Sequence, residues 1–173
     1  FRIIIYRNAG SYSFAKQDSI EILGGGNGSI DWGDYNNDSY PDLIVCGRQN
    51  GTRGRSYIYK NVKGRDFVKV DYDLPKTVES DSKWFDANGD GKLDLFLFGR
   101  EPFNSLRGKI YKNNGNDNFT LVQSNMGLTI CKTSIGDFNN DGDPDIIMQG
   151  STTSMSGHSG SHTPLTRFIK GIQ

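Results

Sequence analysis

The sequence predicts an all-β protein made of four-stranded antiparallel sheets that repeat along the chain. A nine-residue acidic pattern occurs three times, beginning at Asp34, Asp86 and Asp137, so the period is 52 and then 51 residues. A second signature, Ile-Tyr-Arg/Lys-Asn, keeps the same period, with its tyrosines at Tyr6, Tyr59 and Tyr111. Gly is frequent at 22 residues and Pro is rare at 5, which suits many short strands joined by turns. A period near 50 residues indicates a propeller or a solenoid array.

Each unit is predicted to contain four short strands. The first strand precedes the acidic pattern, at residues 29–32, 82–85 and 132–135, and the second is the apolar run that follows the pattern. The third strand carries the Ile-Tyr-Arg/Lys-Asn signature, and the fourth carries Phe14, Phe67 or Phe119. Residues such as Asn113-Asn114-Gly115 are predicted to form the turn between the third and fourth strands. The repeated Tyr and Phe side chains are expected to pack between neighbouring sheets.

The units divide the chain into two whole and two partial sheets within one β-propeller segment. Residues 1–23 supply a third and a fourth strand, and residues 28–73 and 80–124 are complete units. Residues 131–173 supply the first two strands of another unit and a third around residues 167–170. A closed propeller has about 4–8 blades. Further chain, partner chains that complete the ring, and an open array therefore all remain possible.

The acidic pattern has the chemistry of a calcium loop. Oxygen-bearing side chains stand at its first, third, fifth and ninth positions, and a residue with positive φ, usually Gly, is expected at the sixth. The side-chain candidates are Asp34, Asn36, Asp38, Asp42, Asp86, Asn88, Asp90, Asp94, Asp137, Asn139, Asp141 and Asp145. With one backbone carbonyl and water they can complete a shell of about 6–8 oxygens, which Ca²⁺ prefers. The competing interpretation is an Asn/Asp-rich surface turn. A helix–loop–helix calcium hand is disfavoured, because an apolar strand follows the pattern directly.

Charge and composition exclude several classes of function. Lys+Arg and Asp+Glu are equal at 20 each, which does not favour nucleic acid or membrane as a partner. No apolar stretch is long enough to span a bilayer. Cys46 and Cys131 do not form a disulfide framework, and Cys46 is expected to be a small core residue. His158 and His162, in a Ser/Gly-rich segment expected to be a flexible loop, are a weak candidate pair for a transition metal.

The remaining signals concern cellular location. Sequons begin at Asn27, Asn37, Asn50 and Asn118, which suggests a secreted glycoprotein, although Asn37 lies inside an acidic pattern. The sequence has no initiator Met and no signal peptide, and we expect it to be a mature or incomplete piece of a larger protein.

The acidic pattern, followed each time by an apolar run that ends in Gly47, Gly99 or Gly150, resembles the FG-GAP/VCBS repeat. This repeat builds the β-propellers of integrin alpha subunits and of many secreted proteins. The resemblance implies four-stranded blades with Ca²⁺ bound between the first and second strands. It also implies that the carbonyls of Tyr40, Lys92 and Asp143 join the side-chain ligands. Ser39 departs from the pattern, since it stands where the other two loops have Gly, and the chain is short for seven blades.

These observations predict a non-catalytic, extracellular, calcium-stabilised protein of adhesion, recognition or assembly. The resemblance implies a protein or glycan partner on the face away from the calcium loops, where Arg48, Arg53, Arg55, Arg100, Arg107 and Arg167 lie. Solvated charge on variable loops is the competing interpretation of these residues. Self-association is the alternative, as in a filament subunit whose blades are completed by neighbours. A part of a polysaccharide-active enzyme is a further alternative, but we find no nucleophile–base arrangement.

Overall fold

The structure, a computed structural model, describes residues 2–23, 26–48, 54–101, 106–126, 129–151 and 164–169. This part of the chain contains thirteen β-strands and no helix. In chain order the strands are β1 (Arg2–Gly10), β2 (Ser13–Leu23), β3 (Ile30–Gly33), β4 (Asp42–Arg48), β5 (Gly54–Val62), β6 (Asp66–Lys69), β7 (Val78–Phe85), β8 (Asp94–Arg100), β9 (Leu106–Gly115), β10 (Asn118–Met126), β11 (Thr129–Gly136), β12 (Asp145–Ser151) and β13 (Pro164–Ile169). The all-β prediction is confirmed.

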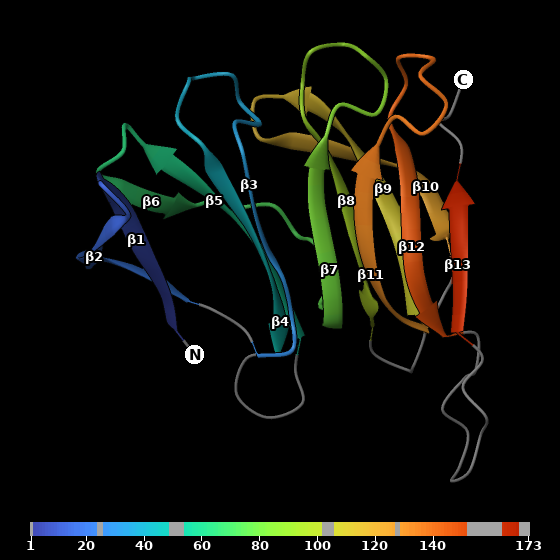
Figure 1. Cartoon of the computed structure of the whole chain (residues 1–173), viewed down its shortest axis with the longest axis horizontal. Helices are drawn as coiled ribbons and strands as arrows, with labels where there is room; N and C mark the ends of the chain where they lie inside the picture. The colour runs from blue at the N-terminus through green and yellow to red at the C-terminus, as the bar shows by residue number, and fades with distance from the viewer. Residues whose placement is uncertain are drawn as a thin grey trace, which may run out of the picture.

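The strands form four antiparallel sheets in which neighbours in the chain are neighbours in space (Figure 1). We call β1–β2 the N-terminal sheet, β3–β6 the second sheet, β7–β10 the third sheet and β11–β13 the C-terminal sheet. The second and third sheets each have four strands, as blades of a propeller do. The chain is therefore a partial β-propeller, as predicted.

The first strands of successive sheets lie beside one another, because β7 contacts both β3 and β11. Hydrogen bonds fix these contacts. The Asp31 carboxylate accepts the N–H of Trp84 at 2.9 Å, and the Asp81 carboxylate accepts the N–H and the hydroxyl of Thr133 at 2.7 and 2.8 Å. Each link joins two sheets through a carboxylate, so the relative rotation of the sheets depends on polar contacts as well as on apolar packing.

The second strands β4 and β8 are apolar on both faces because each is covered by two sheets. Along β4, Ile44 and Cys46 point toward the third sheet, whereas Leu43 and Val45 point toward the N-terminal sheet. Successive strand residues face opposite sides, so a strand buried on both sides is apolar throughout. Cys46 is buried and has a free thiol, which confirms its prediction as a core residue.

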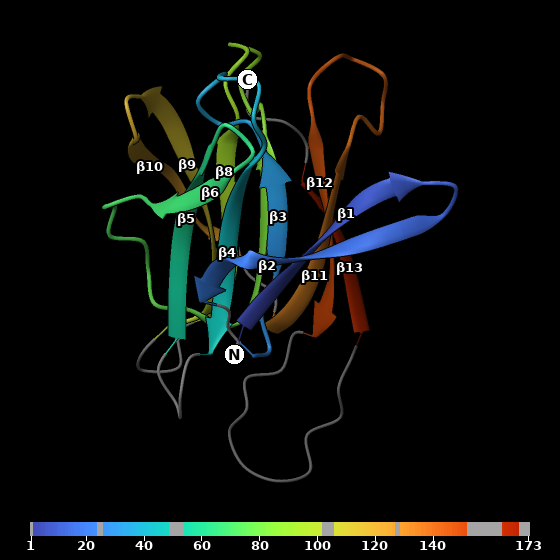
Figure 2. The same ribbon diagram turned by 90° about the vertical axis from the view of Figure 1, so that its left-hand side faces the viewer.

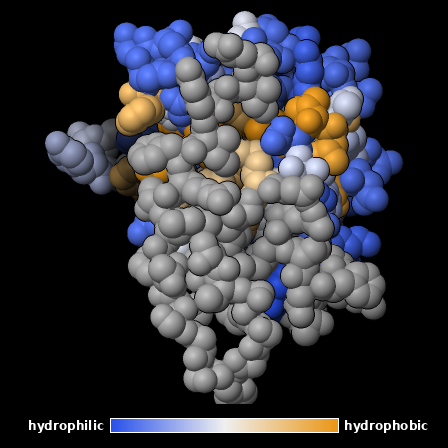
Figure 3. All heavy atoms as spheres, turned by 90° about the vertical axis from the view of Figure 1, so that its right-hand side faces the viewer, coloured by the Kyte–Doolittle hydropathy of each residue, from blue (hydrophilic) through white to orange (hydrophobic). Residues whose placement is uncertain are grey.

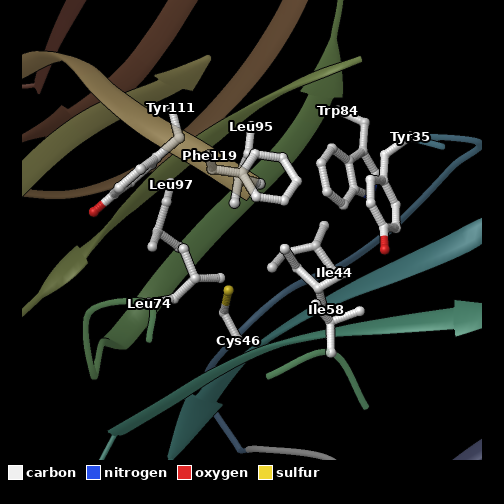
Figure 4. Packing of buried hydrophobic residues seen from close by; sticks show 11 residues of the cluster. Tyr35, Ile44, Cys46, Ile58, Leu74, Trp84, Leu95, Leu97, Tyr111 and Phe119 are labelled. Carbon is white, nitrogen blue, oxygen red and sulfur yellow. The ribbon is translucent and has the colours of Figure 1, made fainter. Parts of the chain in front are cut away.

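The largest apolar cluster lies between the second and third sheets (Figure 4). Tyr35 stacks on Trp84 with ring centroids 5.3 Å apart, and it meets Phe119 at 5.7 Å. Gly33 makes room for this stack, since a Cβ there would lie 2.7 Å from the Trp84 ring.

The predicted packing of the repeated aromatic residues between sheets is confirmed for Tyr59, Tyr111 and Phe119, which are buried. It is wrong for Tyr6 and Phe14, which are exposed. Both belong to the N-terminal sheet, and no sheet of the described part of the chain covers its outer face.

The turn between the third and fourth strands is also corrected. Asn113 and Asn114 belong to β9, and the turn is formed by Asn116 and Asp117, both with positive φ.

Figure 1 shows that the Asp-rich loops lie at one end of the molecule, and Figure 3 shows hydrophilic residues gathered at that end.

Some predictions fall outside the described part of the chain. The histidine pair, Asn50 and Arg53 lie there, and the side chains of Cys131, Arg107 and Arg167 are not described. No helix of the described residues is long and apolar enough to cross a membrane.

Candidate metal centres

Three Asp-rich loops join first and second strands: the first loop is residues 34–42, the second 86–94 and the third 137–145. The first-position Asp closes each loop. In the second loop, Oδ1 of Asp86 accepts the N–H of Asp90 at 3.1 Å and Oδ2 accepts the N–H of Gly91 at 2.8 Å. The equivalent bonds in the other two loops measure 2.7–3.2 Å. Each first-position carboxylate is thus held over the bend.

The third- and fifth-position side chains form a second set of repeated bonds. Oδ1 of Asn88 accepts the N–H of Asp90 at 2.9 Å, and its Nδ2 donates to Oδ2 of Asp90 at 3.2 Å. Oδ1 of Asp90 accepts the N–H of Lys92 at 3.0 Å. The same three bonds recur in the first loop and in the third. The polar side chains are therefore positioned by the backbone around which they gather.

The backbone of each loop turns through the left-handed region twice. At the sixth position φ is 70° for Ser39, 79° for Gly91 and 90° for Gly142, which confirms the predicted positive φ. At the fourth position φ is 58° for Asn37, 71° for Gly89 and 59° for Asn140, which the sequence pattern did not predict. Asn and Gly tolerate this conformation best, so their presence at the fourth position was an available signal.

The ninth-position Asp ties each loop to the rest of its sheet. Oδ1 of Asp94 accepts the N–H of Asn113 at 2.7 Å, and its Oδ2 accepts the N–H of Ala87 at 3.1 Å. In the third loop, Oδ2 of Asp145 accepts the N–H of Phe138 at 2.9 Å. The ninth residue thus joins the end of the loop to its start.

Asp42, the ninth residue of the first loop, is fully buried. Its Oδ1 accepts the N–H of Asn61 at 2.8 Å, whereas its Oδ2 has no hydrogen-bond partner. Burial raises the pKa of Asp42 to about 6, and the backbone amides of Asn61 and Tyr35 oppose this rise. A buried carboxylate oxygen without a donor is costly, and a cation is one partner that fits it.

The Asn of the Ile-Tyr-Lys-Asn signature donates a hydrogen bond to the eighth residue of the loop in its own sheet. Nδ2 of Asn61 donates to the carbonyl of Pro41 at 2.9 Å, and Nδ2 of Asn113 donates to the carbonyl of Leu93 at 3.0 Å. Asn113 also donates to the carbonyl of Tyr35 at 2.7 Å, so it links the first loop to the second. The sequence pattern showed that this Asn recurs but assigned it to a turn.

The carboxylates of each loop do not converge on one point in the described structure. Among the described residues, no three His, Cys, Asp or Glu side chains lie close enough together to hold a metal ion. Each loop also offers amide and carbonyl oxygens, which hard cations accept readily. A carboxylate has about four lone-pair positions, so an oxygen that accepts one amide bond can still bind a cation. The donor chemistry and the loop backbone therefore fit Ca²⁺.

In the second loop, a lysine of β9 lies close to the fifth-position Asp. In the second loop, Nζ of Lys112 lies 3.7 Å from Oδ2 of Asp90, and both side chains are partly exposed. The Lys92 backbone amide, together with the Asn88 amide and nearby lysines, lowers the pKa of Asp90. A lysine thus already offsets part of the negative charge in this loop.

The predicted seventh-position candidates, Tyr40, Lys92 and Asp143, each donate their N–H to the fifth-position Asp at 2.9–3.0 Å. This bond places them in the loop backbone beside the polar side chains. Their carbonyls stay predicted ligands.

Comparison with known proteins places these loops in a family. The family model for the FG-GAP-like repeat matches residues 1–45 and 86–148, which is more than half of the chain and includes all three Asp-rich loops. Among curated proteins, none matches the chain. The repeated sheets, the repeated loops and the family match agree, and the chain belongs to the FG-GAP-like repeat family.

Proposed function

We propose that this chain is a non-catalytic, calcium-stabilised β-propeller module that acts outside the cell in adhesion, recognition or assembly. The observation that carries the proposal is the same hydrogen-bonded acidic loop built three times, with a buried, unpartnered carboxylate oxygen of Asp42 in the first. Three carboxylates within nine residues repel one another, and a divalent cation between them removes that repulsion.

The side chains at the first, third, fifth and ninth positions would hold the ion, with the seventh-position carbonyl. When bound, calcium supplies charge neutralisation and a cross-link between the start and the end of each loop. The chain itself supplies the rest: the amide bonds hold each carboxylate in place, and Asn61 and Asn113 brace the loop against its sheet. Extracellular calcium is millimolar, so even sites with Kd of about 10⁻⁴–10⁻³ M would be largely filled there.

Thermal unfolding tests calcium binding directly. The melting temperature is measured in excess calcium, in magnesium and in chelator, together with calorimetric titration of calcium into the chelator-treated protein. We expect a marked rise with calcium and a smaller one with magnesium, because each site filled at 100 times its Kd adds about 2.7 kcal/mol. A matched variant, Asp38→Asn with Asp90→Asn and Asp141→Asn, should lose the calcium response. Identical melting curves in calcium and chelator would refute the proposal.

The end of the molecule opposite the loops is our proposed partner surface. A hollow of about 420 Å³ beside β5 and the segment that joins β6 to β7 is lined by Arg55, Lys76 and Asp73 and by the rings of Tyr57 and Tyr72. Charged groups of both signs beside aromatic rings fit a polar partner such as a glycan or a protein loop. Arg100 is already paired with Glu79, so it contributes less to attraction than its position in the sequence suggested.

A binding screen tests the partner surface. Acidic and neutral glycans are passed over the immobilised protein at low and high salt, with Lys76→Ser as the variant and Lys63→Ser, on the β5–β6 turn, as the control. Salt-sensitive binding that only the first variant weakens supports the proposed surface. Equal binding by both variants contradicts it.

A further inference from the structure

Hydrogen bonds join the first Asp-rich loop directly to the second, although the two loops belong to different sheets. Nδ2 of Asn37, at the fourth position of the first loop, donates to the carbonyl of Gly91, at the sixth position of the second, at 3.1 Å. Nδ2 of Asn113 donates to the carbonyls of Tyr35 at 2.7 Å and of Leu93 at 3.0 Å, one in each loop. Both loops lie at the same end of the molecule (Figure 2). A change in the backbone of either loop therefore strains or breaks its bonds to the other.

The ring of Tyr35 adds a third link between the first loop and the third sheet. Its hydroxyl donates to the carboxylate of Asp117 in the β9–β10 turn, and Nζ of Lys60 lies 3.8 Å from the same carboxylate. These groups line a hollow of about 450 Å³ to which both loops contribute residues. Tyr35 stands between Asp34 and Asn36, two candidate ligands, so its position follows the state of the first loop.

The bond that Asn37 makes has no counterpart from the second loop to the third. The fourth position of the second loop is Gly89, which has no side chain that could donate to a neighbouring loop. The backbone is alike at the two positions, with φ of 58° at Asn37 and 71° at Gly89. The chain therefore contains one loop conformation both with and without this donor.

We infer that the first and second loops bind calcium with positive coupling, so that an ion in either loop raises the affinity of the other through the hydrogen bonds that join them. The inference rests on the proposed function, since it presupposes that the loops bind calcium. A first loop that holds an ion keeps Asn37 and Tyr35 where they bond to Gly91 and Asn113. Less of the second loop is then left to order, so its binding costs less conformational entropy. Couplings of this kind amount to about 5–150-fold in affinity and are equal in both directions.

Repulsion between two bound ions acts in the opposite direction. Asp38 and Asp90, the fifth-position candidate ligands, are exposed. Salt therefore screens charges held there, with a Debye length of about 8 Å at physiological ionic strength. The hydrogen bonds between the loops are not screened in this way. The coupling should therefore be positive at physiological salt and should grow as salt is added.

Calcium titrations followed by two-dimensional NMR measure the loops separately. The N–H groups of Ser39, Gly91 and Gly142 each donate to the first-position Asp of their own loop, so each reports binding in one loop. Asp38→Asn weakens binding in the first loop, and it should raise the Kd measured at Gly91 by about fivefold or more. The Kd measured at Gly142 should change by less than about twofold, as for an independent site. Asp90→Asn should likewise raise the Kd measured at Ser39, because the coupling is reciprocal.

Two substitutions at the fourth position test whether the bond between the loops carries the coupling. Asn37→Gly removes the donor and keeps a residue that accepts positive φ, as Gly89 does in the second loop. The link through Asn113 remains, so the effect of Asp38→Asn on the second loop should fall from about fivefold to about twofold in the Asn37→Gly background. Asn140→Gly, at the same position of the third loop, is the control and should leave the fivefold effect unchanged.

The outcomes distinguish the coupling from calcium binding itself. If the amide signals of the loops shift with calcium but the Kd at Gly91 is the same in the wild type and in Asp38→Asn, the coupling is overturned and the proposed function stands. If Asn37→Gly leaves the effect of Asp38→Asn unchanged, the hydrogen-bonded link is not its route and the inference fails. If no loop amide responds to calcium, the proposed function fails and the coupling with it.

Discussion

The first and second Asp-rich loops share one sequence pattern but lie in different surroundings. At the second position the first loop has Tyr35, buried between two sheets, and the second loop has Ala87, which is half-buried. At the ninth position, Asp42 leaves one buried oxygen without a partner, whereas both oxygens of Asp94 accept backbone N–H groups.

Loops with the same sequence pattern therefore differ in what stabilises them. The second loop satisfies its own carboxylates with backbone donors, so it can hold its shape without an ion. The first loop anchors a sheet junction through Tyr35 and contains an unpartnered oxygen, so its stability depends more on the neighbouring sheet and on a cation. The first loop should therefore be destabilised more than the second, both by loss of its contacts with the neighbouring sheet and by loss of the cation.

The largest effect is expected from Tyr35→Ala. It removes the ring that stacks on Trp84 and should lower the free energy of unfolding by about 3–5 kcal/mol. Phe138→Ala, at the same position of the third loop, removes an exposed ring and should cost within about 0.5 kcal/mol in dilute solution. Urea unfolding measures both. Equal decreases in the free energy of unfolding would show that the position of Tyr35 between two sheets does not add to the stability of the protein.

Asn113→Ala should follow, because Asn113 donates to carbonyls of both the first and the second loop. Loss of a buried, fully hydrogen-bonded side chain leaves these carbonyls unpartnered, and we expect a cost of about 2–3 kcal/mol. Asn61→Ala removes a donor to only one loop carbonyl, that of Pro41, and should cost about 1–2 kcal/mol. Chemical unfolding of the two variants gives the order, and a reversed order would argue against the link between loops.

The role of these two Asn residues shows what the sequence could and could not predict. The period, the apolar second strands and the acidic loops depend on local pattern, and the structure has them where expected. An Asn followed by a Gly a few residues later, as in Asn113-Asn114-Gly115, indicates a turn by local rules. The contact that Asn113 makes with Tyr35 spans 78 residues, and no local pattern contains it.

The candidate site was predictable in its residue types but not in its surroundings. Tyr35, Ala87 and Phe138 occupy one position of the pattern, yet the first is buried, the second half-buried and the third exposed. Whether such a residue is covered depends on which sheet follows it. Likewise, Tyr6 and Phe14 have the same residue types as their buried counterparts, and only the absence of a preceding sheet in the described structure separates them.

Asp42→Asn and Asp94→Asn separate protein contacts from calcium. In chelator, Asp42→Asn should be the milder change, because it removes a buried charge with an unpartnered oxygen, whereas Asp94→Asn disrupts a satisfied carboxylate. In calcium, each variant should lose the contribution of one site, up to about 2.7 kcal/mol at 100 times the Kd. Melting temperatures in both buffers give the comparison. If Asp42→Asn lowered the melting temperature in chelator more than Asp94→Asn, the unpartnered oxygen of Asp42 would not be destabilising as we describe.

The smallest effect is expected from Ser39→Gly, which changes only the backbone preference of the first loop. Ser39 adopts a φ of 70°, where a residue with a Cβ is strained by about 1–2 kcal/mol. Gly relieves the strain but adds freedom to the unfolded chain, which offsets about 0.5–1 kcal/mol. The net gain should therefore be a few tenths to about 1 kcal/mol. The reciprocal variant, Gly91→Ser, introduces the strain at a φ of 79° and should destabilise the second loop by a similar amount. Neither change touches a candidate ligand. Calorimetric calcium titration should therefore show that Ser39→Gly brings the calcium affinity of the first loop closer to that of the second. If the melting temperature of Ser39→Gly fell instead, the Ser39 hydroxyl would stabilise the loop in a way that its backbone conformation does not reveal.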